Sequence, residues 1–367
     1  MNGATKLPGP AQAQTQGAEA TSQTQGGLQV ERVPELPATL PMASSTAPLI
    51  ARTNAPTFTP TPAPTPTPLA AAPAGPRTLR VQHDTRYHYD RPVEVAHHSA
   101  WLRPRNTEVQ QVQGWTLHID PPPDSSVQES RDAFGNWRHG FGHSRVHEVL
   151  TVSSRFQAVL AAPPAVDASL SPPWEEVVQA LRYHAGVTQP DAVEFVLPSQ
   201  FAPHAPVLAA YAADLFTAGR PLLDGALALM DRVHTRMLYK PHSTDVATDA
   251  LKALAQGQGV CQDFAHLMIG VLRSLGLAAR YVSGYLLTHP PEGQPRLLGA
   301  DASHAWAAVW CPLHGWVALD PTNNIAVGQD HVTLAWGRDY ADVAPLRGVI
   351  RGGGLAPPEV GVTVEPV

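Results

Sequence analysis

The sequence has little cysteine, no long apolar run and few charged residues. Only two cysteines, Cys261 and Cys311, occur among 367 residues, too few for the disulfide framework of a small secreted protein. We therefore expect a reducing, cytoplasmic location. No stretch of about 18 apolar residues could form a transmembrane helix, and the N-terminus lacks the basic and apolar segments of a secretory signal. The sequence thus predicts no membrane partner.

Charged residues make up 15% of the sequence, and the net charge is −6 with the histidines counted as neutral. Proteins that bind nucleic acid usually carry a clustered basic surface, so we expect no nucleic-acid partner. The length is sufficient for two domains and additional segments. The sequence does not indicate an oligomeric state.

Residues 1–76 are low in complexity. They hold 14 of the 38 prolines, and Phe58 is their only aromatic residue. Such a segment buries too little apolar surface to offset the entropy lost on ordering. We predict a disordered Pro/Thr/Ala-rich tail, with polyproline II character in the Thr-Pro repeats of residues 57–68.

Residues 77–160 have the pattern of β-strands. Apolar and polar residues alternate in 78–83 and in 114–119, and a further strand-like run covers 146–158. Asp132 to Asn136 has the composition of a turn between strands. This region is predicted to form a small antiparallel β-domain, a sandwich.

Residues 161–350 combine helices and strands. Apolar spacing predicts helices in 161–258, among them 206–218, 221–238 and a short helix capped by Thr248. Another helix begins at Cys261. Strands are predicted from 279, from 304 and from 316, and residues 351–367 are a tail or a last strand.

A thiol, an imidazole and a carboxylate follow one another in this region, at Cys261, His304 and Asp320. Cys261 follows a Gly-Gln-Gly turn at a predicted helix start, where the partial positive charge of the helix stabilises a thiolate. The free N–H groups of the first turn can also hold a developing oxyanion. These residue types are those that thiol-based acyl transfer requires.

The strands that carry His304 and Asp320 are predicted to pair through a hairpin. If Trp310 faces His314, His304 faces Asp320 directly; if Trp310 faces Trp316, the two are offset by two residues. Both registers place them on the same face of the sheet. A carboxylate there can orient the imidazole and stabilise its charged form.

Four motifs around these residues resemble the bacterial transglutaminase-like superfamily, a group also described as proposed cysteine proteases. The motifs are Gly259–His266, Ala279–Tyr285, Asp301–Trp306 and Gly315–Asn323. Residues 80–158 resemble the N-terminal β-domain that accompanies one subgroup, and residues 337–345 resemble a signature of it.

The resemblance implies a papain-like α+β core, in which the cysteine helix packs on an antiparallel sheet. It makes Cys261 the nucleophile, His304 the general base and acid, and Asp320 the orienting carboxylate. It implies no obligatory organic cofactor. Some animal members need calcium, but this sequence has no oxygen-rich loop with calcium-ligand spacing, so we expect neither cofactor nor metal.

Other candidate residues have simpler interpretations. We interpret Cys311 as an ordinary thiol, His266 as a packing residue and Trp306 as a core or cleft wall. Asp263 is favourable in the first turn of a helix without any catalytic role.

Three histidines, His139, His143 and His147, are spaced by four residues and would share one face of a strand, which suggests a metal site. They lack a carboxylate or cysteine companion at the usual spacing. We therefore predict them to be surface histidines.

The predicted activity is attack of Cys261 on a peptide or protein amide, giving a thioester. Water would then make the enzyme a peptidase or amidase, whereas an amine acceptor would make it a transglutaminase. We favour hydrolysis because the resemblance is to bacterial proteins regarded as proteases. The alternative is a noncatalytic module that binds peptides in a papain-like cleft.

Overall fold

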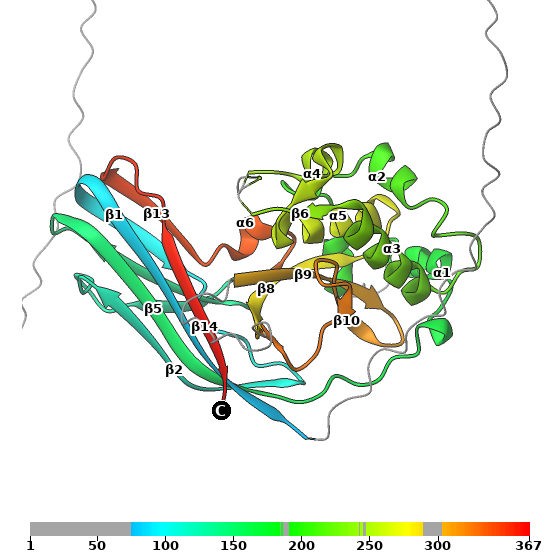
Figure 1. Ribbon diagram of the computed structural model, residues 1–367, viewed down its shortest axis with the longest axis horizontal. Helices are drawn as coiled ribbons and strands as arrows, with labels where there is room; N and C mark the ends of the chain where they lie inside the picture. The colour runs from blue at the N-terminus through cyan, green and yellow to red at the C-terminus, as the bar shows by residue number, and fades with distance from the viewer. Residues whose placement is uncertain (1–74, 184, 186–190, 242, 245–246, 289–302) are drawn as a thin grey trace, which may run out of the picture. The chain divides into compact units, whose positions relative to one another are not determined.

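The computed structural model describes residues 75–183, 185, 191–241, 243–244, 247–288 and 303–367. The predicted disordered tail lies almost entirely outside the described residues. Within them, the fold consists of an N-terminal β region and an α+β core (Figure 1). None of the helices in these ranges is long and apolar enough to span a bilayer.

The N-terminal β region is a seven-stranded antiparallel sheet. Its strands are β1 (Arg77–Ala100), β2 (Gln110–Asp120), β3 (Gln128–Arg131), β4 (Trp137–His143), β5 (His147–Leu160), β13 (Leu346–Gly352) and β14 (Glu359–Pro366). The order is β2-β5-β1-β4-β3, and both β13 and β14 pair with β1. The end of the chain thus returns to the sheet that its first strand begins.

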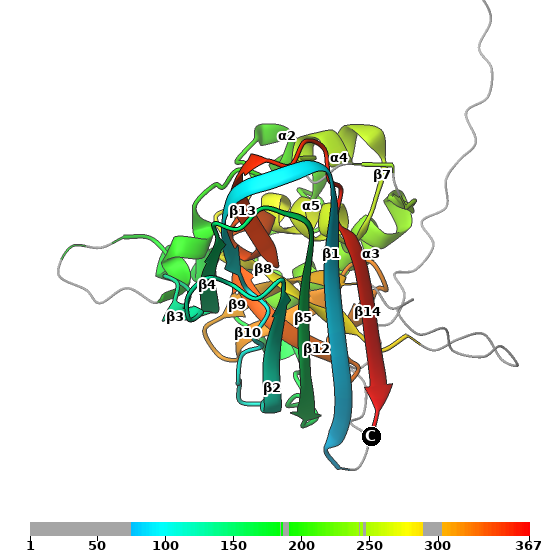
Figure 2. The same cartoon turned by 90° about the vertical axis from the view of Figure 1, so that its left-hand side faces the viewer.

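The long strand β1 divides this sheet into two halves, because its register shifts between His88 and Val93. The first half pairs with β5 and β14, and the second half pairs with β4 and β13 (Figure 2). Side chains from both halves share one buried cluster that contains Ala100, Leu102, Ile119, Phe141, Leu150 and Val152. The two layers expected of a sandwich are therefore two halves of one sheet.

The helices of the core precede and include the helix that carries Cys261. They are α1 (Trp174–Ala180), α2 (Pro206–Tyr211), α3 (Leu222–Arg236), α4 (Ala250–Gln256) and α5 (Cys261–Ser274), with 3₁₀ turns at Ala168–Leu170 and Asp191–Val196. Asp249, not Thr248, caps α4, since its carboxylate accepts a hydrogen bond from the backbone N–H of Lys252. Gly257 ends α4 in the left-handed conformation.

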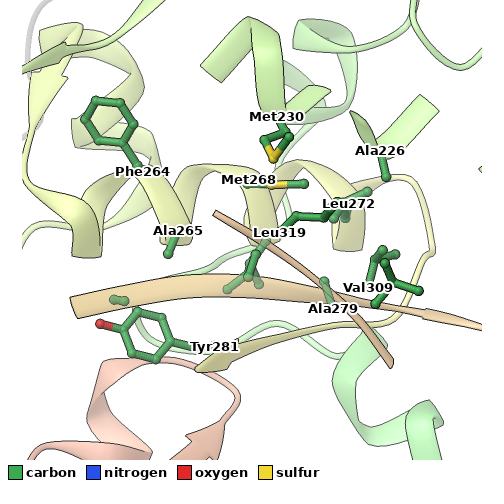
Figure 3. Close-up of a cluster of buried hydrophobic side chains, with 14 of the residues drawn as sticks. Ala226, Met230, Phe264, Ala265, Met268, Leu272, Ala279, Tyr281, Val309 and Leu319 are labelled. Atoms are coloured by element: carbon green, nitrogen blue, oxygen red, sulfur yellow. The ribbon is translucent and has the colours of Figure 1, made fainter. Parts of the chain in front are cut away.

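The core sheet has five antiparallel strands in the order β11-β10-β9-β8-β12. These are β8 (Ala279–Leu286), β9 (Ser303–Cys311), β10 (Gly315–Asp320), β11 (Ile325–Ala326) and β12 (His331–Gly337); β6 (Leu238–Tyr239) pairs with β7 (Gln258–Gly259), and α6 spans Tyr340–Val343. Figure 3 shows the side chains of α5 between those of α3 and the sheet. The predicted α+β core, with the cysteine helix on an antiparallel sheet, is confirmed.

The opposite face of this sheet carries a second buried cluster, formed by Val282, Trp306 and Ala308.

The N-terminal β region contacts strand β12 of the core sheet. The amide of Gln110 donates to the carbonyl of Thr333 over 2.7 Å, and the amide of Asn136 donates to the carbonyl of Trp336 over 2.8 Å. The β region is therefore attached to the core by backbone-directed hydrogen bonds.

Candidate active site

Cys261 is the first residue of α5 and is partly buried. The chain enters this helix through a tight turn held by Asp263, whose carboxylate accepts hydrogen bonds from the backbone N–H of Val260 and the hydroxyl of Thr244. A Cβ on Gly259 would lie 2.5 Å from the same carboxylate, so only glycine fits there. Asp263 thus shapes the start of the helix, which agrees with the non-catalytic interpretation of this residue.

His304 lies near the start of β9, and Asp320 is the last residue of β10. The observed register pairs Trp310 with Trp316, the second of the two alternatives. His304 and Asp320 are therefore offset by two residues, yet they share a face and their Nε2 and Oδ2 atoms are 2.7 Å apart. The predicted histidine–carboxylate contact is present.

Asp320 is fully buried and held by several donors. Its Oδ1 accepts the backbone N–H groups of Thr322 and Asn323, and its Oδ2 accepts the side-chain amide of Asn323 over 2.7 Å. Burial alone would raise the pKa of Asp320, but hydrogen bonds from His304 and His331 hold it well below its usual range. The carboxylate is therefore ionised at neutral pH.

Burial also opposes a charge on His304. Hydrogen bonds to Asp320 and to Cys261, together with the charges of both groups, outweigh burial and raise the pKa of His304 to about 10. Because Asp320 occupies Nε2, Nδ1 is the ring nitrogen left for the thiol. The structure thus places His304 against Asp320 and brings Cys261 close enough to act on the same imidazole.

Sequence reasoning missed His331, the first residue of β12. Its Nδ1 accepts the backbone N–H of Gly328, and its Nε2 lies 3.2 Å from Asp320 Oδ2. A neutral imidazole whose Nδ1 accepts a hydrogen bond must carry its hydrogen on Nε2, so His331 donates to Asp320. Asn323, which lay within a matched motif but had no assigned role, is the other side chain on this oxygen.

The donor atoms of His304, Asp320 and His331 lie within 4.8 Å of one another, a spacing that a metal ion could use. These atoms already contact one another through hydrogen bonds: Nε2 of His304 and Nε2 of His331 both contact Oδ2 of Asp320. The arrangement fits a hydrogen-bonded carboxylate at least as well as a set of metal ligands.

Two tyrosines lie close enough to Cys261 to sense its charge. Burial first, and then Cys261, raises the pKa of Tyr239 and holds that of Tyr281 well above its usual range. Tyr281 is buried, whereas Tyr239 is 50% exposed and its neighbour Leu238 is 63% exposed. An apolar surface therefore adjoins the thiol.

The other sequence candidates do not join this site. Cys311 is buried within the hairpin strand β9, and His266 is buried against Phe201 and Tyr281. Trp306 is fully buried, so it is a core residue.

The prediction that His139, His143 and His147 are surface residues is wrong. Their exposed fractions are 3%, 3% and 9%, because His139 packs against Trp115 and His143 packs against Phe141 and His147. Each has a hydrogen-bond partner: Glu129 for His139, the carbonyl of Pro121 for His143, and the carbonyl of Arg145 for His147.

Comparisons with known proteins agree with this architecture. Residues 209–321 match the family described as transglutaminase-like superfamily, and residues 79–159 match the bacterial transglutaminase-like N-terminal region. An uncharacterized protein of Mycobacterium tuberculosis is 39% identical over 284 residues, which cover 76% of this chain and 88% of that protein. One of Mycobacterium leprae is 32% identical over 291 residues, 78% of this chain and 97% of the relative.

A crystal structure of a proposed cysteine protease from Cytophaga hutchinsonii has the same fold, with a TM-score of 0.63 and 19% identity over 80% of this chain and 92% of that one. A protein-glutamine gamma-glutamyltransferase of Pseudomonas aeruginosa is 39% identical over 93 residues, 24% of this chain and 14% of that enzyme. From the two family matches and the mycobacterial relatives, this chain belongs to the transglutaminase-like superfamily and carries the N-terminal region of its bacterial transglutaminase-like members.

Proposed function

We propose that this protein is an enzyme that transfers acyl groups from amide bonds through a thioester on Cys261. The observation that carries the proposal is the His304–Asp320 pair, 2.7 Å apart, with Cys261 at the start of α5 close enough to the same imidazole to raise its pKa. A peptide or protein is the proposed substrate. No cofactor takes part in the proposed steps.

In the first half of the reaction, the Cys261 thiolate attacks the amide carbonyl carbon. Backbone N–H groups in the first turn of α5 stabilise the oxyanion. The C–N bond then breaks, and protonated His304 gives its proton to the leaving amine. With a pKa of about 10, His304 holds that proton at neutral pH. Asp320 keeps the ring oriented and balances its charge.

The second half decides the class of enzyme. His304 removes a proton from water, whose oxygen attacks the thioester carbonyl carbon. The C–S bond then breaks, which releases a carboxylic acid and returns the Cys261 thiolate. An amine in place of water gives a new amide by the same steps. We favour hydrolysis, in keeping with the proposed cysteine protease of like fold. The match to a protein-glutamine gamma-glutamyltransferase supports the amine alternative.

The test uses a peptide library incubated with and without a fluorescent primary amine and followed by mass spectrometry. We expect cleaved or amine-labelled peptides with the wild type and with Cys311→Ala, the matched thiol control, and none with Cys261→Ala. Full activity in Cys261→Ala would exclude the mechanism.

Brief alkylation by iodoacetamide at pH 6 separates the enzyme from the noncatalytic binding module. An activated thiolate predicts fast labelling of Cys261 that is lost in His304→Ala, with buried Cys311 as the internal reference. Equally slow labelling of Cys261 in both proteins would favour a binding cleft.

A further inference from the structure

Two arginines stack on the same tryptophan at the junction between the N-terminal β region and the core sheet. The guanidinium carbon of Arg105, which follows β1, lies 3.6 Å from the ring centre of Trp336. That of Arg280, in β8, lies 3.8 Å from Trp336 and 4.3 Å from Trp316. Two carbons this close to one ring centre must flank its two faces, so Arg280 is held between two indoles.

Among the described residues, Arg280 has no acidic partner. No hydrogen bond or ion pair of its side chain occurs within the described ranges, and its Nε is buried without an acceptor. Burial, followed by the charge of Arg105, lowers the pKa of Arg280 to about 9, and no carboxylate opposes that shift. The indole faces stabilise the cation from above and below, but they cannot accept its in-plane N–H groups.

The guanidinium group of Arg105 has hydrogen-bond acceptors for only some of its N–H groups. One terminal nitrogen donates to the carbonyl of Phe134 and to the side-chain oxygen of Asn136, while its Nε is also buried without an acceptor. Burial, followed by the charge of Arg131, lowers the pKa of Arg105 to about 10, although the charge of Asp132 opposes this shift. The carboxylate of Asp132 already accepts from Trp101 and Asn136.

A second Arg–Trp stack adjoins this pair. Arg103 and Arg131 both stack on Trp137, at 3.9 and 3.3 Å, and Arg103 also faces Trp115. A cavity of about 480 Å³ is lined by Arg103, Arg131, Trp115 and Trp137. Within the part of the chain that the structure describes, Arg103 has an ion pair with Glu129, and Arg131 has none. Positive charge is thus concentrated at this junction, although the whole protein carries a net charge of −6.

We propose that Arg105 and Arg280, flanking Trp336, form a binding site for an oxyanion, either a carboxylate or a phosphate. A guanidinium presents its N–H groups as a planar fork that matches such anions. A buried cation without a counter-ion is costly, and an anion would remove that cost. Because Arg105 comes from the β region and Arg280 from the core, the bound anion joins the two.

This site is separate from the candidate active site. Arg280 lies four residues along β8 from Gly284, which pairs with His304, a separation of about 13 Å at ~3.3 Å per residue. Trp306, fully buried, fills the sheet face between them. The proposal therefore stands or falls independently of the thiol chemistry.

Thermal unfolding of the full chain tests the site. Sodium phosphate, compared with sodium chloride at equal ionic strength, should raise the unfolding midpoint in a saturable way, by roughly 3 °C at ten times its Kd. Arg280→Gln should abolish the shift, while Arg155→Gln, an exposed arginine of β5, should keep it. If Arg280→Gln does not fold, Arg105→Gln is compared in its place.

Two peptides of one sequence, one with a free C-terminal carboxylate and one amidated, identify the source of the anion. A shift with the free acid alone assigns the site to peptide carboxylates, and a shift with phosphate alone assigns it to free phosphate. No anion-specific shift in the wild type, or an equal shift in Arg280→Gln, would overturn the proposal and leave the stack a purely structural contact.

Discussion

Asp320 accepts hydrogen bonds from His304, His331 and Asn323 on a single oxygen. A carboxylate held by this many donors can occupy only one orientation, and it fixes the orientation of His304 in turn. In the proposed mechanism, His331 acts only through Asp320, which makes it a positioning residue and not a catalytic one.

Replacing His331 with phenylalanine removes one donor from Asp320 while keeping an aromatic ring in the buried site. A hydrogen bond to a charged group contributes about 1.5–3 kcal/mol, so kcat/KM should fall by about tenfold or more. His331→Gln, whose amide can still donate, should recover part of the loss.

The control for that experiment is His118→Phe, which changes an exposed histidine of β2. A merely structural role would lower the unfolding midpoint of His331→Phe and His331→Gln alike and leave kcat/KM of the folded fraction unchanged. That pattern would remove His331 from the mechanism.

The raised pKa of His304 links stability to pH. Its folded value of about 10 exceeds the ordinary 6.5, so the stabilisation is complete below pH 6.5 and is lost as the pH rises through 10. The unfolding midpoint should therefore fall more steeply between pH 7 and 10 in the wild type than in His304→Gln. Parallel curves for the two proteins, measured by calorimetry, would contradict the assignment.

At the scale of single elements, the turn before α5 sets the position of the thiol. Gly259 pairs with Tyr239 in the two-residue strands β6 and β7, and its missing Cβ lets Asp263 reach the backbone of Val260. The start of the helix, and with it any oxyanion site, depends on this close approach.

Gly259→Ala should therefore displace Asp263 and slow alkylation of Cys261 by about tenfold or more, since the added methyl would lie 2.5 Å from a carboxylate oxygen. Gly361→Ala, in β14, meets no atom within 4 Å and serves as the control. Unchanged labelling of Cys261 in Gly259→Ala would show that the turn tolerates the shift.

The sequence predicted best those helices and strands whose pattern of apolar and polar residues is local. The alternation of apolar and polar residues located strands of the β region, and helical spacing located the helix at Cys261. Because successive side chains of a strand point to opposite faces, His304 and Asp320 were predicted to share a face in either register. The contact of His331 with Asp320 could not be predicted in this way. It depends on the three-dimensional arrangement of β12 and β10, which no local sequence pattern encodes. The burial of His139, His143 and His147 likewise depends on how the sheet folds over itself.

At the scale of the whole molecule, β13 and β14 complete the sheet that β1 begins. Val362 and Val364 of β14 are buried, and residues 79–86 of β1 pair with this strand along its whole length. The last strand therefore belongs to the hydrophobic core and is not an appended tail. A cytoplasmic location stays a prediction from the cysteine content.

Deleting residues 358–367 should destabilise the protein by about 3 kcal/mol or more, because two valine side chains lose burial worth roughly 1.5–3 kcal/mol each. The deletion also leaves the edge of β1 unpaired. Urea unfolding measures the loss, with Val367 alone removed as the control. An unchanged midpoint after the larger deletion would show that β14 contributes little.

The pairing of β1 with β14 also affects the order of folding. Leu79 faces Pro366, so two strands far apart in the sequence must meet before this edge of the sheet is complete. Until then, β1 has a bare edge that a chaperone, or another unfolded chain, could occupy. Contacts between such distant strands form more slowly than local ones, so the edge of β1 should be among the last parts of the sheet to be protected.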